Sequence, residues 1–140
     1  MVSRRIFIKS GCAACLGLSG ASLLNACATR LPMVKLSPDA GRVLTVPETS
    51  FVEGVEMLVV RTNTLENDIL LRKVGERYLA LYLHCTHEGV GLTPTAERIY
   101  CHAHGSVFDL EGQVVKEPAF EPLKTFKTEF NNHQILIYLT

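Results

Sequence analysis

Two short segments of this chain each place a cysteine close to a histidine. Cys85 and His87 have the spacing C-x-H, and Cys101 and His104 have the spacing C-x-x-H, with 13 residues between the two pairs. Thiolates and imidazoles are common ligands of zinc and of iron–sulfur centres. Two ligands on one tight loop can diverge toward neighbouring metal ions, so two such loops can hold a binuclear centre with sulfur ligands on one iron and nitrogen ligands on the other.

Two other chemistries use the same residue types. A set of two cysteines and two histidines can bind a single zinc ion, although the C-x-H spacing is shorter than that of zinc fingers. A zinc site would also not explain the sequence G-S-x-F-D that follows the second pair. Cys85 and Cys101 could instead form one structural disulfide. The iron–sulfur interpretation is favoured, and a zinc-stabilised binding module is the alternative from a different class.

The complete pattern C-x-H…C-x-x-H-G-S-x-F-D resembles the Rieske family of 2Fe–2S proteins. The matching residues are Cys85, His87, Cys101, His104, Gly105, Ser106, Phe108 and Asp109. Gly112, Pro118 and Pro122 fit the strand and the proline loop that follow in that family. The resemblance implies one Rieske-type 2Fe–2S cluster, with the two cysteines on the inner iron and the two histidines on the outer iron near the surface. It also implies that electrons enter and leave through the imidazoles.

The sequence departs from the Rieske subunits of cytochrome bc-type complexes at two loop positions. Those subunits carry a second cysteine in each loop, and the two cysteines form a disulfide that braces the cluster. Val90 and Ala103 stand at the matching positions. The loops of this chain must therefore rely on packing and on backbone hydrogen bonds.

The residues expected around the cluster are Gly105, Ser106, Phe108 and Pro118. Hydrogen bonds to the sulfur atoms of a cluster raise its reduction potential. Ser106 keeps a hydroxyl group, whereas Phe108 stands where bc-type subunits have a tyrosine. The resemblance therefore implies a reduction potential below that of quinol-oxidising Rieske proteins. Pro118 is expected to shield the cluster from water.

Strand patterns dominate the chain after residue 40. Residues 65–71 fit either a loop or a short turn of helix. We predict an all-β domain over residues 42–140, built as a Rieske-like stack of small antiparallel β-sheets, with a cluster-binding subdomain of two loops at about residues 84–122. Strands are expected at residues 42–46, 55–61, 69–74, 78–83, 98–100, 107–109, 113–115, 123–130 and 134–139.

The N-terminus resembles a twin-arginine export signal. Residues 3–9 read S-R-R-I-F-I-K, and an uncharged run rich in Gly, Ala, Ser and Cys follows at residues 10–29. That route exports folded proteins, so the signal predicts a cofactor independently of the cluster motif. We expect residues 1–28 to be a signal or anchor segment, to be kept out of the fold, and residues 29–41 to be a tether.

The sequence L-N-A-C that ends at Cys27 resembles a bacterial lipobox, and we expect a lipid at Cys27. Cleavage near Ala26 or Ala28 to a soluble protein and retention of an uncleaved anchor are the alternatives. Lipidation or retention would place the protein on the periplasmic side of the membrane and attach it there.

The charge of the chain bears on its partners. All 14 acidic residues lie beyond Pro38, and the chain without its signal segment has 11 basic residues. This mildly acidic balance argues against a nucleic-acid partner.

No cluster of a nucleophile, a base and an oxyanion donor is apparent in the sequence, so we expect an electron-transfer protein that is not catalytic alone. The donor or acceptor is a redox protein or a large oxidoreductase subunit. Three settings fit: a free-standing exported carrier, the small subunit of an exported oxidoreductase, or the Rieske subunit of a cytochrome bc-type quinol-oxidising complex. The absent cysteine pair and Phe108 weigh against the third.

Overall fold

The computed structural model describes residues 31–140, which form β-strands and one turn of 3-10 helix, η1 (Glu48–Ser50). No helix in this part of the chain is long and apolar enough to cross a membrane. The predicted signal segment 1–28 and the lipidation candidate Cys27 lie outside the described residues. The strands are β1 (Met33–Lys35), β2 (Val43–Pro47), β3 (Met57–Arg61), β4 (Ile69–Val74), β5 (Arg77–Tyr82), β6 (Thr93–Pro94), β7 (Ile99–Tyr100), β8 (Val107–Phe108), β9 (Val114–Lys116), β10 (Thr125–Asn131) and β11 (Gln134–Tyr138).

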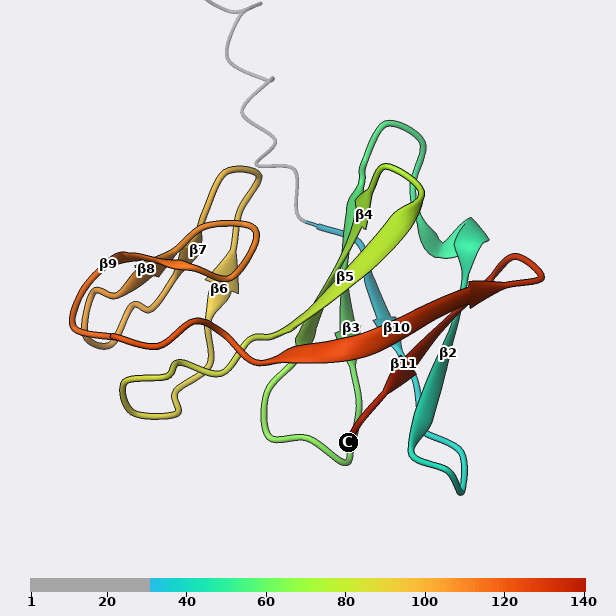
Figure 1. Ribbon diagram of the computed structural model, residues 1–140, viewed down its shortest axis with the longest axis horizontal. Coiled ribbons are helices and arrows are strands. Elements are labelled where there is room, and N and C mark those ends of the chain that lie inside the picture. The colour runs from blue at the N-terminus through green and yellow to red at the C-terminus, as the bar shows by residue number, and fades with distance from the viewer. Residues whose placement is uncertain (1–30) are drawn as a thin grey trace, which may run out of the picture. The chain divides into compact units, whose positions relative to one another are not determined.

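Seven strands form a large sheet in the order β1-β3-β4-β5-β10-β11-β2 (Figure 1). The alternation of apolar and polar residues explains β2, since Leu44 and Val46 are fully buried while Thr45 between them is exposed. In β3 and β4, by contrast, three consecutive residues are buried. One face of this sheet covers the first core. The buried residues of the first core are Leu44, Val46, Leu58, Val60, Ile69, Leu71, Tyr78, Ala80, Phe126, Ile135, Ile137 and Leu139.

Four short strands form a second sheet in the order β6-β7-β8-β9, and all of its pairs are antiparallel. Along the chain this sheet lies between β5 and β10, which pair with each other in the large sheet. Residues 83–124 therefore leave the large sheet at one strand and return at its neighbour, and we call them the cluster lobe. Figure 1 shows the lobe to one side of the large sheet.

A second core joins the cluster lobe to the large sheet. Leu70 on β4 and Leu81 on β5 belong to it, together with buried residues of the lobe. Arg72 on β4 also reaches across, and its guanidinium donates a hydrogen bond of 2.7 Å to the carbonyl oxygen of Leu110. The same guanidinium forms an ion pair of 2.8 Å with Glu111. The lobe is thus fastened to the long strands by both apolar packing and polar contacts.

The all-β prediction is confirmed, and each predicted strand range overlaps an observed strand. Residues 29–41, predicted to be a tether, contain β1, which runs parallel to β3 and lies outside the predicted domain 42–140. Strands β1 and β6 were not predicted. The three residues of β1 and the two residues of β6 are too few to show a period. The partner of β1, strand β3, is also distant in sequence. Within residues 65–71, a loop without helix precedes β4, which begins at Ile69.

Candidate metal centre

The two cysteine–histidine segments fold into loops with the same backbone hydrogen bonds. In the first loop, residues 85–90, the amide of Cys85 donates to the carbonyl oxygen of Val90 at 2.9 Å, and the amide of Gly89 donates to that of Cys85 at 2.7 Å. The second loop, residues 101–106, repeats both bonds at 2.9 Å with Cys101, Ser106 and Gly105. Each cysteine is therefore the closing residue of a tight turn.

Both loops need a glycine at their fifth residue. Gly89 has a φ of 75° and Gly105 a φ of 84°, in the left-handed region that side chains disfavour. A Cβ atom added at Gly89 would also lie 3.1 Å from the imidazole of His84. The glycines allow the first loop to turn back two residues after His87 and the second loop to turn back directly after His104.

The predicted ligands separate into an inner and an outer layer. Cys85 is 1% exposed and Cys101 is 2% exposed, and both are free thiols packed in the second core. His87 and His104 are at the surface, with ring centroids 5.0 Å apart and ring planes at 78°. The structure thus brings the two loops together, with both thiols buried and both imidazoles at the surface.

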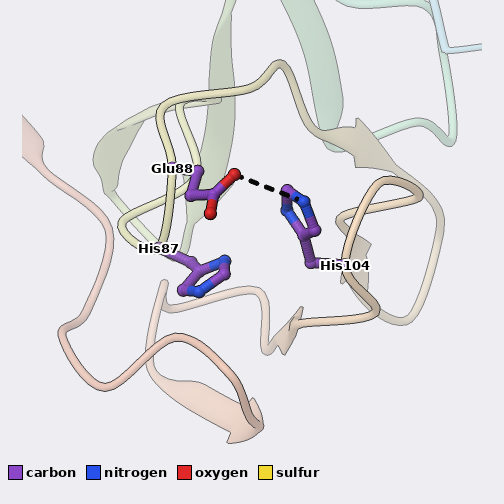
Figure 2. A group of neighbouring side chains, drawn as sticks. All are labelled: His87, Glu88 and His104. Carbon is purple, nitrogen blue, oxygen red and sulfur yellow. Dashed lines mark ion pairs between the residues drawn. The ribbon is translucent and has the colours of Figure 1, made fainter.

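A carboxylate stands beside the outer pair. Oε2 of Glu88 lies 3.3 Å from Nε2 of His104, and Figure 2 shows the side chain of Glu88 directed at this ring. Glu88, His87 and His104 place ligand atoms within 4.8 Å of one another. Because Nε2 of His104 faces the carboxylate, Nδ1 of that ring is left for a metal. A partner on the other ring nitrogen is what metal-binding histidines usually have.

A third loop, residues 117–122, is fastened to both of the others. The hydroxyl oxygen of Ser106 accepts a hydrogen bond of 3.0 Å from the amide of Ala119. The hydroxyl of Thr86 donates a hydrogen bond of 2.7 Å to the carbonyl oxygen of Glu121. Phe120 lies between these two attachment points and is 80% exposed. The third loop thus presents an aromatic side chain to solvent next to the histidine loops.

The structure also places the other residues that were expected near the cluster. Ser106 and Phe108 are fully buried, and Pro118 is half-buried next to buried Ala119. The hydroxyl of Ser106 accepts from Ala119 through its oxygen, so its own proton remains free to be donated. His102 is exposed and its ring stacks at 19° on a neighbouring tyrosine, apart from the His87–His104 pair.

Sequence reasoning missed one residue that contacts the first loop. The side-chain amide of Asn67, between β3 and β4, lies 2.9 Å from Nδ1 of His84 and 3.1 Å from the carbonyl oxygen of Gly89. Asn67 is 18 positions before Cys85, and no motif marks it. Only the folded arrangement of β4 and β5 brings it to the loop.

The residues present fit a 2Fe–2S cluster. Two thiols enclosed by apolar side chains provide sulfur ligands away from water, and two imidazoles at the rim provide nitrogen ligands for a second iron. The same four donors could bind zinc, so the donor set alone does not decide between the two metals. A small all-β domain with this layered donor set is the arrangement expected of an iron–sulfur electron-transfer protein.

Comparison with known proteins decides the family. The Rieske [2Fe-2S] domain model matches residues 41–127. The chain therefore belongs to the Rieske [2Fe-2S] domain family, whose function is electron transfer through one cluster of this type. The donor set described above is consistent with that cluster.

Individual relatives agree with this assignment. The chain is 27% identical over 128 residues to the cytochrome b6-f complex iron-sulfur subunit of Chlorobaculum thiosulfatiphilum, covering 86% of this chain and 70% of that protein. Its fold is similar to the plasma membrane Rieske protein of Synechocystis PCC 6803, with a TM-score of 0.55, 23% identity, and coverage of 66% of this chain and 96% of the other. A chain from the complex of oxygenase and ferredoxin in carbazole 1,9a-dioxygenase has a TM-score of 0.52, 22% identity, and coverage of 70% and 94%.

The two histidines of the second loop provide a matched test of the ligand assignment. His104→Ala removes one of two nitrogen ligands, so we expect loss of the visible absorption and of the rhombic electron paramagnetic resonance (EPR) signal of the reduced protein. His102→Ala changes an exposed imidazole in the same loop and should leave both spectra intact. Retention of the spectra in His104→Ala, or equal loss in both variants, would contradict the assignment.

Proposed function

We propose that Cys85 and Cys101 bind the inner iron of the cluster and that His87 and His104 bind the outer iron. The observation that supports this most is the layering of buried thiols beneath exposed imidazoles. The cluster, when bound, takes up and releases one electron at a time. The chain's own residues then have separate tasks: the second core excludes water from the sulfur side, and the histidines bring the outer side to the surface.

The surface around the histidines supports contact with a redox protein. The three loops together contain three carboxylates, those of Glu88, Glu117 and Glu121, and no lysine or arginine. Phe120 adds an exposed aromatic ring between the two attachment points of the third loop. An apolar anchor within an acidic surface favours a partner whose docking face is apolar and rimmed by basic residues.

The setting we propose is an exported protein, attached to the membrane through a lipid at Cys27 or through the uncleaved segment 1–28. It is either a free-standing carrier or the small subunit of an exported oxidoreductase. The support is the S-R-R-I-F-I-K sequence at residues 3–9 and the L-N-A-C sequence at Cys27. A lipidated chain would begin at Cys27.

A second candidate is the Rieske subunit of a cytochrome bc-type quinol-oxidising complex. The 27% identity to a cytochrome b6-f complex iron-sulfur subunit favours it. Val90, Ala103 and Phe108 weigh against it, because they remove the bracing disulfide and one hydroxyl donor of such subunits. The reduction potential distinguishes the two candidates.

Potentiometric titration of the cluster distinguishes the exported carrier or small subunit from the subunit of a quinol-oxidising complex. With Ser106 as the one hydroxyl donor of two, we expect a midpoint potential clearly below about +300 mV, the upper end for Rieske centres. Phe108→Tyr restores the second hydroxyl and should raise the potential, whereas Ser106→Ala should lower it further. A wild-type potential near that upper end would contradict the carrier proposal and favour the quinol-oxidising complex.

Mass spectrometry of the mature protein tests the proposed export and attachment. We expect a polypeptide that begins at Cys27 with the mass of a lipid added. Cys27→Ser should remove the added lipid mass and the N-terminus at residue 27. An unmodified N-terminus at residue 28 or beyond in a soluble fraction would contradict attachment.

Stopped-flow kinetics test the proposed docking surface. Phe120→Ser should slow electron transfer from the reduced protein to cytochrome c, a basic redox protein, severalfold, because it removes an apolar contact. It should leave the rate with the small complex hexaammineruthenium(III) unchanged. Val52→Ser changes another exposed apolar residue, outside the cluster lobe, and is the control. Equal rates for Phe120→Ser and wild type with cytochrome c would contradict the surface.

A further inference from the structure

One side chain in a connection between two strands of the large sheet contacts the first loop directly. Asn67 lies between β3 and β4, and its amide nitrogen is 3.1 Å from the carbonyl oxygen of Gly89 and 2.9 Å from Nδ1 of His84. Gly89 accepts through its oxygen while its own amide donates to Cys85. Asn67 therefore contacts the loop at the residue that closes the turn around Cys85.

The chemistry of these contacts fixes the orientation of both side chains. A backbone carbonyl oxygen can only accept a hydrogen bond, so the Asn67 atom that faces Gly89 is its amide nitrogen. The same nitrogen faces Nδ1 of His84, which must then accept. His84 is thus held in the tautomer with its proton on Nε2. One amide group uses both of its protons to join two points on either side of Cys85.

The surroundings leave this arrangement little freedom. The imidazole of His84 stacks on the ring of Tyr82, with centroids 4.9 Å apart and an interplanar angle of 3°. The hydroxyl of Tyr82 accepts a hydrogen bond of 3.4 Å from the backbone amide of Asn67. A Cβ atom added at Gly91 would lie 2.8 Å from Oδ1 of Asn67, so the amide fills the space beside the loop.

We propose that Asn67 is a positioning residue for the cluster, and that the unit of Asn67, His84 and Tyr82 braces the first loop. This inference rests on the proposed ligand role of Cys85 and His87. Val90 and Ala103 cannot supply the disulfide that fastens the loops in bc-type subunits. The brace of this chain runs instead from the first loop to the large sheet, through hydrogen bonds and ring stacking.

Four variants of the holoprotein test the brace. Asn67→Ala removes both side-chain hydrogen bonds, and Asn67→Asp keeps the size of the side chain but replaces the donor with a second acceptor that faces the carbonyl oxygen of Gly89. Gly91→Ala leaves Asn67 present and displaces it, at a backbone conformation that alanine can adopt. Asn63→Ala changes an exposed asparagine in the same connection and is the control.

Cluster retention is the first measurement. Loss of visible absorbance is followed with a chelator present, and we expect it to be about tenfold faster in Asn67→Ala than in wild type, the factor that follows from losing about one to two hydrogen bonds. Asn67→Asp and Gly91→Ala should behave like Asn67→Ala, and Asn63→Ala like wild type. The midpoint potential and the EPR line shape should shift in the first three variants only.

Hydrogen exchange gives a readout independent of the cluster's redox chemistry. Amide exchange in a peptide covering residues 84–92 should be faster in Asn67→Ala, while exchange in β10 and β11 should be unchanged. Wild-type retention, potential and exchange in both Asn67→Ala and Gly91→Ala would overturn the brace. A wild-type protein without a cluster would instead contradict the proposed function, so the two failures are distinguishable.

Discussion

The proposed cluster site depends on the burial of two thiol groups, which would have to be ionised to bind iron. Cys85 is 1% exposed and Cys101 is 2% exposed, within an apolar core. An uncompensated thiolate is strongly disfavoured in such surroundings, so a metal ion is what makes these two positions stable as ligands. In the proposed assignment, His87 and His104 would avoid this cost, because they would bind as neutral imidazoles and both lie at the surface. The division between inner sulfur and outer nitrogen thus follows from solvation as well as from ligand chemistry.

Three sets of contacts hold the two ligand loops in this arrangement. The second core joins β4 and β5 to the cluster lobe by apolar packing. Arg72 fastens the turn at Leu110 and Glu111 to β4. The third loop is attached to both ligand loops through Ser106 and Thr86. Because the lobe leaves and returns at adjacent strands, these contacts act on a segment whose ends are already fixed by the large sheet.

Local sequence patterns were sufficient to predict nine of the eleven strands in residues 31–140 and both ligand loops. The C-x-H and C-x-x-H spacings, each with a glycine within two residues of the histidine, identify loops whose form depends on a few neighbouring residues. The role of Asn67 and the pairing of β1 could not be predicted. Asn67 reaches Gly89 only because β4 and β5 form a hairpin in a particular register. Strand β1 has three residues, too few to show a period, and its parallel pairing with β3 depends on tertiary packing.

The most direct test of the account is electron–nuclear double resonance on the reduced protein, purified without exposure to oxygen. Two nitrogen ligands on one iron predict two distinct, strong nitrogen couplings to the unpaired electron. Labelling the histidines with nitrogen-15 should change both couplings together. A reduced protein with no strong nitrogen coupling, or a colourless protein that contains zinc and no iron, would contradict the assignment of two cysteines and two histidines to one binuclear cluster.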